Sequence, residues 1–168
     1  MKLSDAKAQF IQAWGLLGAQ WGVNRTMAQI HALLLIAPEP LCAEEIMEAL
    51  DISRGNANMN VRELMNWGIV EKILVPGERK EFFIAEKDIW KAGTAIARER
   101  KKRELDPILK VLIQLNKVEG DQKDKHVKAF RDTISNIQKF AHQTDAALNA
   151  FIKSEEHWFY STLMKVIR

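Results

Sequence analysis

The sequence has few of the features that mark secreted or membrane proteins. Only one of its 168 residues, Cys42, is a cysteine, so an internal disulfide is excluded and a reducing compartment is expected. The longest apolar run, near "ALLLIA", is far too short to span a bilayer. The first ten residues are polar and charged and lack the apolar core of a signal peptide. We therefore expect a soluble, cytoplasmic protein without a membrane partner.

Groups that could carry catalysis or bind a metal are also scarce. The histidines show no metal-ligand spacing with one another or with Cys42; they are His31, His126, His142 and His157. The sequence contains no nucleophile elbow, phosphate-cradling glycine loop or paired acid-base motif. We therefore predict no metal, no cofactor and no enzymatic activity. An enzyme would need a pocket that none of the sequence motifs indicates.

The charges are nearly balanced. The chain has 25 Lys and Arg against 22 Asp and Glu, which gives a net charge of +3, and 47% of its residues are hydrophobic. This composition is that of an ordinary globular protein of one domain or two small ones. A net charge this small does not by itself indicate a nucleic-acid partner, so the placement of the basic residues has to carry that argument.

The hydrophobic period changes in the middle of the chain. Helices are predicted from an N-cap at Ser4, then over about 25–37 and 43–50, and again after a cap at Ser53. Asp51 and Ile52 form a tight turn between the last two. The runs "IVEKILV" and "EFFIAE", separated by "PGERK", predict a β-hairpin. Three short helices, a tight turn before the third and then a hairpin are the order of a winged helix-turn-helix.

The stretch Ile52–Gly68 begins poorly for a helix. Its first turns contain Gly55, Asn56, Asn58 and Asn60, where an Asn costs about half a kcal/mol and a Gly about 1 kcal/mol against Ala. On a helical wheel one side is apolar and should face the core; it carries Ala57, Val61, Leu64 and Gly68. The opposite side carries Gly55, Met59, Arg62 and Asn66.

This polar side has the composition of a major-groove reader. Asn can bond adenine and Arg can bond guanine with paired hydrogen bonds, and a thymine methyl would contact an exposed Met. Gly55 would allow close backbone approach, and Ser53 with the helix dipole suits a phosphate. The alternative is an ordinary capped helix start, which accounts for Ser53 but not for three Asn inside the helix. The predicted DNA-contacting residues of this helix are Ser53, Arg54, Asn56, Asn58, Met59 and Arg62.

Basic residues also occur at the hairpin tip and in one later run. Arg79 and Lys80 follow Pro76-Gly77, and we predict that they contact phosphate or the minor groove, with Glu78 diluting the charge. The run "RERKKRE" mixes both signs, and such a run is usually a solvated helix face.

The flanking segments are predicted to be helical. An apolar stripe runs from Phe10 to Trp21, and a regular heptad-like stripe runs from Val127 to Phe151. Asp106-Pro107 is expected to break or restart a helix, and "HWFYSTLMKVI" predicts a last amphipathic helix. Because one module reads too few base pairs, we predict a homodimer in which at least one stripe pairs between subunits. The predicted organisation is mainly α with a small β-hairpin wing: 1–23 as an N-terminal dimer or effector helix, 24–87 as the DNA-binding module and 88–168 as the dimerisation and effector region.

The stretch from Glu44 to Lys87, about a third of the chain, resembles the winged-helix core of MarR-type transcriptional regulators and, more closely, their GbsR branch. The motifs that carry this resemblance are "ISRGN", "VRELMNWGIV" and "PGERKEFF". The resemblance implies a homodimer on a pseudo-palindromic operator in double-stranded DNA, usually as a repressor. It also implies a recognition helix over Ser53–Trp67 and a wing arginine at Arg79. Some members of the branch are associated with choline and glycine betaine genes and respond to a small effector.

Two further hypotheses remain open at this stage. Aromatic cages bind quaternary ammonium ions, so Trp14, Trp21 and Trp90 are candidate effector-binding residues, although such residues are more often core or interface. In the second, the winged helix is an adaptor for protein–protein contact that binds no DNA. Salt discriminates this adaptor from a DNA binder, because only phosphate contacts release counterions.

Overall fold

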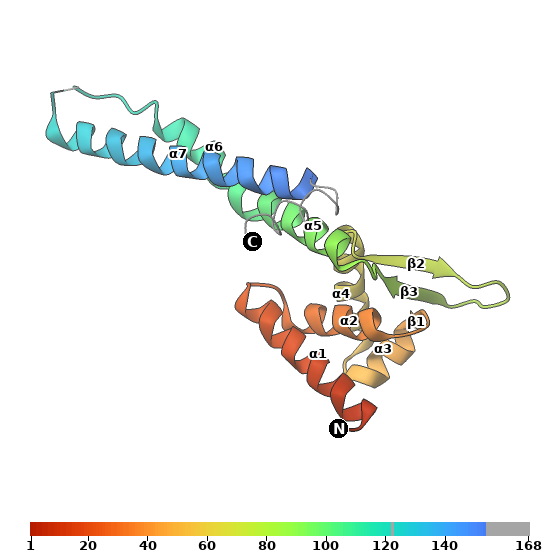
Figure 1. The fold of residues 1–168 in the computed structure, drawn as a ribbon. Coiled ribbons are helices and arrows are strands. Elements are labelled where there is room, and N and C mark those ends of the chain that lie inside the picture. Colours follow the sequence, from red (N-terminus) through yellow and green to blue (C-terminus); the bar gives the residue numbers. More distant parts are fainter. Residues whose placement is uncertain (122, 154–168) are drawn as a thin grey trace, which may run out of the picture. The chain divides into compact units, whose positions relative to one another are not determined.

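A computed structural model describes residues 1–121 and 123–153. The protein is mainly helical with one small antiparallel sheet, which confirms the predicted fold class (Figure 1). The chain divides into two compact units, the first spanning Met1–Ala92 and the second beginning at Gly93. Within the described residues, no helix is both long and apolar enough to cross a membrane.

The first unit opens with two helices that pack closely. Helix α1 spans Leu3–Gln20, and α2 spans Arg25–Ile36 with Asn24 as its N-cap, whose side chain accepts a hydrogen bond from the Met27 N–H at 3.1 Å. A Cβ on Gly18 would lie 2.5 Å from the Cβ of Ala28, so only glycine allows this approach. The helices therefore meet along a glycine face that the apolar stripe did not predict.

The predicted start of the first helix was wrong by two residues. Lys2 is the N-cap, and Ser4 lies inside the helix, where its hydroxyl donates to Asp5 at 3.1 Å. The stripe from Phe10 to Trp21 is only partly buried, because the helix turns Ile11 and Gly15 inward, and Trp21 remains 56% exposed.

The helix-turn-helix is formed as predicted. Helix α3 spans Ala43–Leu50, and α4 spans Arg54–Asn66. Between them Asp51 adopts a left-handed conformation with φ of 51°, and its N–H and that of Ile52 close on the Met47 carbonyl. Asp tolerates this conformation better than most residues, so a two-residue turn and the Ser53 cap suffice to start α4.

The sheet has three strands rather than the two of the predicted hairpin. Strands β2 (Val70–Leu74) and β3 (Glu81–Ala85) form that hairpin, with Val70 opposite Ala85 and Leu74 opposite Glu81. Strand β1 (Leu41–Cys42) pairs with the other edge of β3, giving the order β1-β3-β2. A two-residue strand has no periodicity of its own, and its pairing partner lies about 40 residues later in the chain.

The core of the first unit holds the recognition helix in place. Its most buried side chains come from α2, α3, α4 and the start of the hairpin; they are Ile30, Leu34, Ile46, Val61, Leu64 and Ile69. Cys42 is buried and packs as a small core residue. Lys87 caps the C-terminus of α2, because its Nζ donates to the carbonyls of Leu34, Leu35 and Ala37 at 2.7–2.8 Å.

The helical run after the hairpin changes its geometry just before the proline and restarts there as a new α-helix. Helix α5 spans Ile89–Arg100, the π-helix η1 spans Lys101–Leu105 and α6 spans Asp106–Leu115. Pro107 lacks an N–H, and its ring would clash with the carbonyl four residues earlier in a regular helix. The wider π-turn lies directly before α6, which begins at Asp106 with Pro107 in its first turn, and this confirms the predicted break or restart at Asp106-Pro107.

The second unit contains a helical hairpin. Helix α7 is a single helix from Lys125 to Lys153 that lies beside α6 (Figure 1). Leu112 of α6 packs with Ile134 and Ala141 of α7, so part of the predicted stripe is buried within the chain. Phe130 and Ile137 of the same stripe are 40% and 45% exposed. The predicted helix "HWFYSTLMKVI" lies outside the described residues.

Candidate nucleic-acid interface

The beginning of α4 is built from a cap and a turn. Ser53 precedes the helix in an extended conformation, and its Oγ accepts the Asn56 N–H at 3.3 Å. Ser53, Arg54 and Gly55 are exposed. The positive end of the helix dipole therefore faces solvent at a polar, uncovered surface, which is the arrangement that binds phosphate at helix N-termini.

The two sides of α4 differ sharply in burial. Ala57, Val61 and Leu64 are at most 2% exposed, as the helical wheel predicted. Gly68 is an exception, because the helix has ended and Gly68 lies exposed with φ of 73°. On the opposite side Met59 is 60% exposed, and Asn58, Arg62 and Asn66 are also exposed.

Gly55 has open space around it. A Cβ built at this position would meet no atom of residues 1–121 or 123–153 within 4 Å. Packing within the protein therefore gives no reason for glycine here, in contrast to Gly18, where Ala28 is in the way. The position is open to close approach by an external group.

Arg54 is held by an acidic residue of the preceding helix. Its Nη2 donates to Oε1 of Glu44 at 2.7 Å, and both side chains are largely exposed. The pKa of Glu44 is lowered, chiefly by a backbone hydrogen bond and further by the nearby charges of Lys80 and Arg54. The Glu44 carboxylate therefore lies close enough to attract Arg54 in the first turn of α4 and Lys80 near the hairpin tip. The sequence analysis did not predict this link.

Asn60, which the sequence analysis did not include among the contact residues, is buried. It is 3% exposed, and its Nδ2 donates to the Asn56 carbonyl at 2.8 Å and to Asn56 Oδ1 at 2.6 Å. One of the three Asn in the first turns is thus internal, and it holds another that is half-buried.

The hairpin tip, or wing, is a tight turn. The Glu78 N–H donates to the Val75 carbonyl at 3.1 Å, with Pro76 and Gly77 in the two central positions. Gly77 has φ of 86°, which a type II turn requires at that position. Arg79 and Lys80 follow in the exposed return of the chain.

The basic run "RERKKRE" is neutralised within the second unit. Arg100 pairs with Glu104 at 3.0 Å and Arg103 pairs with Glu99 at 2.6 Å. Lys101 pairs with Asp106 and with Asp145 of α7, at 2.8 and 2.9 Å. Most side chains of the run remain at least partly exposed, in agreement with its interpretation as a solvated helix face.

The tryptophans proposed for an effector site have separate surroundings. Trp14 is half-buried and its Nε1 donates to His31 Nδ1 at 3.3 Å, while its ring contacts Phe10 with a centroid distance of 5.5 Å. Trp21 is the exposed C-cap of α1, and Trp90 lies in the first turns of α5. In the described ranges no cluster of His, Cys, Asp or Glu is arranged to hold a metal ion.

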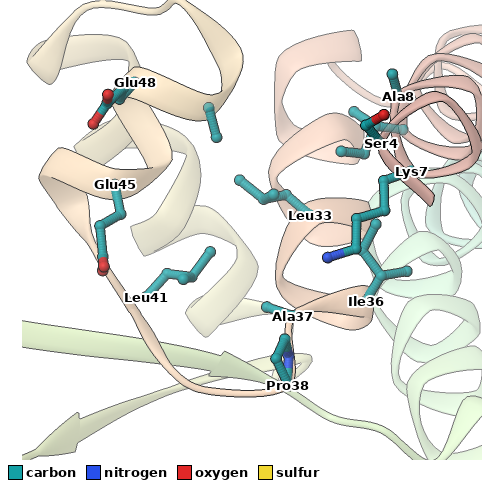
Figure 2. Close-up of a pocket in the computed structure, with 12 residues that line it drawn as sticks. Ser4, Lys7, Ala8, Leu33, Ile36, Ala37, Pro38, Leu41, Glu45 and Glu48 are labelled. Carbon is teal, nitrogen blue, oxygen red and sulfur yellow. The ribbon is translucent and has the colours of Figure 1, made fainter. Parts of the chain in front are cut away.

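The first unit has an open groove between α1 and α3, with a volume of about 510 Å³ (Figure 2). Its floor is apolar and comes largely from α2, with Leu33 and Ile36 facing it, and from Leu41. Lys7 lies on the α1 side and Glu48 on the α3 side. None of the three candidate tryptophans lines this groove.

Comparison with known proteins gives a consistent result. Residues 21–81 match the model of the MarR family. The chain is 24% identical over 131 residues to the HTH-type transcriptional regulator MmpR5 of Mycobacterium tuberculosis, covering 77% of this chain and 79% of that protein. It is 25% identical over 143 residues to the HTH-type transcriptional repressor GbsR of Bacillus subtilis, covering 85% of this chain and 68% of that protein.

A solved structure described as a transcriptional regulator has the same fold. It superposes with a TM-score of 0.58 at 22% identity, covering 89% of this chain and 99% of that chain. Together these similarities support a DNA-binding transcriptional regulator with a MarR-type winged helix-turn-helix.

Proposed function

We propose that this protein is a sequence-specific repressor of the GbsR branch that binds a pseudo-palindromic operator as a homodimer. The observation that carries the proposal is the exposed side of α4. Gly55 is uncovered, Met59 is 60% exposed, and Arg54, Asn58 and Arg62 surround them. A helix in the major groove needs this set of donors with one apolar contact for a thymine methyl.

In this proposal the wing contributes phosphate contacts. Arg79 and Lys80 are exposed on a hairpin that starts directly after the recognition helix. Their contacts with phosphate would not distinguish one base sequence from another. Ser53 at the start of α4 binds a further phosphate. Base contacts and phosphate contacts thus come from two adjacent elements of one unit.

The helical flanks provide the dimer interface. Apolar side chains of α6 and α7 remain exposed, among them Ile108 at 52%, Ile137 at 45% and Phe140 at 70%. Solvated helices rarely keep so many large apolar side chains uncovered, and such surfaces mark interaction sites. A second copy of the chain is the partner that a two-fold operator requires.

A small-molecule effector is the finer part of the proposal. The groove between α1 and α3 has an apolar floor, with Lys7 on the α1 side and Glu45 and Glu48 on the α3 side, which suits a small, largely apolar molecule that carries charged groups. Because α3 forms one wall and precedes the recognition helix, a ligand there contacts the helix-turn-helix directly. A thermal-shift screen with aromatic acids, choline and betaines, repeated on Lys7→Ala, tests this assignment.

Salt-dependent binding tests the function itself. Duplexes are selected from a random library, and the affinity of the best duplex is then measured at about 50 and 200 mM salt. With six phosphate contacts the affinity falls by roughly 10³-fold over this range. A protein–protein adaptor, the competing hypothesis, retains no duplex even at the lower salt. Arg54→Ala and Asn58→Ala are expected to relax base preference, whereas Arg79→Ala weakens all duplexes alike.

A further inference from the structure

The buried side chain of Asn60 has a role in base recognition, an inference that rests on the proposed function of α4 as the base reader. Its side chain is almost completely inaccessible and faces Asn56, one turn earlier. Asn60 itself is too buried to touch DNA. Any effect that it has on recognition must therefore pass through Asn56, which is half-buried near the exposed helix start.

The orientation of both amides follows from one backbone group. The Asn56 carbonyl can only accept a hydrogen bond, so the Asn60 atom that lies 2.8 Å from it must be the amide nitrogen. The same nitrogen lies 2.6 Å from the Asn56 side chain, and two amide nitrogens cannot bond each other. The Asn56 atom that faces Asn60 is therefore its oxygen, Oδ1.

This arrangement leaves the amide nitrogen of Asn56 for an external partner. Asn binds adenine when its oxygen accepts from N6 and its nitrogen donates to N7 at the same time. In Asn56 one of the two lone pairs of the oxygen accepts from Asn60, and the planar amide directs its nitrogen away from that contact. Asn56 thus offers an external partner two N–H donors but only one remaining acceptor lone pair.

The surroundings of Asn56 favour acceptors as partners. Arg54, two residues earlier, has only donors, and the helix N-terminus adds a positive dipole end. Guanine offers two acceptors in the major groove, O6 and N7, whereas adenine pairs its N7 with an amino donor. Adenine must therefore place its amino group against an oxygen that already accepts from Asn60, whereas O6 and N7 of guanine can both accept from the Asn56 amide.

We propose that Asn60 is a positioning residue that sets base preference: it holds Asn56 Oδ1 so that Asn56 selects guanine rather than adenine. This assignment differs from the expectation that Asn56 bonds adenine through both amide atoms.

Selection from a random duplex library with the full chain tests the proposal. Asn56→Ala identifies the base pair that Asn56 reads, as the one position at which enrichment is lost. Wild type is expected to enrich guanine there, and replacing that guanine by adenine should weaken binding about tenfold. Asn60→Leu, close in size, frees Asn56 Oδ1 and should reduce this discrimination to less than about twofold or reverse it, with the other positions unchanged.

Two more variants control for the possibility that Asn60→Leu misfolds. Asn60→Ser can still donate its single hydroxyl proton to the Asn56 carbonyl and leaves Oδ1 free, so it should act like Asn60→Leu. Val61→Ala, at the adjacent buried position, should lower stability without changing the preference at the Asn56 position.

Different outcomes would contradict the positioning role of Asn60 and the proposed function of the protein. Adenine enriched by wild type at the Asn56 position, or an unchanged preference in both Asn60 variants, would overturn the positioning role. If wild type enriches no sequence at low salt, the proposed function fails and this inference fails with it.

Discussion

The indole Nε1 of Trp14 donates to Nδ1 of His31 at 3.3 Å, which fixes His31 as a neutral ring with its proton on Nε2. His31 is 3% exposed, and among the residues described no group hydrogen-bonds its Nε2. Burial, with a smaller contribution from the charge of Lys87, lowers the pKa of His31 from 6.5 to about 4. The contact between α1 and α2 thus depends on an uncharged imidazole.

This relationship predicts acid sensitivity. Because the unfolded chain binds a proton at His31 more readily than the folded chain, the His31 contribution is complete above pH 6.5 and is lost as the pH falls towards about 4. The total loss is about 3 kcal/mol. Urea unfolding at several pH values measures it. His31→Phe should remove most of this slope, and an unchanged slope in that variant would contradict the assignment.

Gly55→Ala should separate stability from binding. Nothing in the chain opposes a methyl group at this position, and Ala favours a helix by about 1 kcal/mol over Gly. The melting temperature should therefore rise by about 2–4 °C. If the backbone at Gly55 approaches DNA, the same methyl weakens duplex binding. A variant that is more stable and binds equally well would show that Gly55 has no role at the interface.

Gly18→Ala should have the opposite effect on stability. The new methyl would lie 2.5 Å from the Ala28 Cβ, so α1 and α2 must separate. Overpacking of this kind costs about 1–3 kcal/mol, part of which the better helix propensity of Ala offsets. Gly93→Ala is the matched control, because its Cβ would meet no atom within 4 Å. Equal melting temperatures for the two variants would contradict the close approach.

The parts of the fold that were predictable carry local signals. Ser53 caps a helix within three residues, Asp51 suits a tight turn, and Pro76-Gly77 forms the wing turn through a bond between Val75 and Glu78. Each of these is specified by residues that are neighbours in the chain. The alternation of burial along α4 also follows from helical periodicity alone.

The parts that were missed depend on long-range contacts or on atomic orientation. Lys87 bonds carbonyls of α2 some 50 residues earlier, and β1 exists only because β3 pairs with it. On the helical wheel Asn60 lies about 40° from Leu64, at the edge of the core side, so periodicity could have indicated its burial. Its hydrogen bonds to Asn56 depend on atomic orientation that a helical wheel does not contain.

Glu44→Gln should change how selectively the protein binds. Glu44 holds Arg54 at 2.7 Å, and both are exposed, so the pair adds little stability. Removing its charge beside the DNA-facing side should strengthen binding to duplexes of any sequence by about two- to fivefold at low salt, an effect that salt screens. The ratio of specific to non-specific affinity should fall, because Arg54 loses its anchor. Glu48→Gln on the same helix is the control, and an effect of equal size there would assign the change to net charge alone.

The exposed side of α7 gives the last prediction, which concerns assembly. Ile137 is 45% exposed on the same helix that buries Ile134 and Ala141 against α6. If a second copy covers Ile137, a charge there is buried on association, and an unpaired buried charge costs several kcal/mol. Ile137→Glu should therefore shift the protein from dimer to monomer in sedimentation and weaken binding to a two-half-site duplex more than to a single half-site. Gln143→Glu introduces the same charge at an exposed position of α7 and should remain dimeric. An Ile137→Glu protein that keeps its helicity and sediments as a dimer would move the interface away from this side of α7.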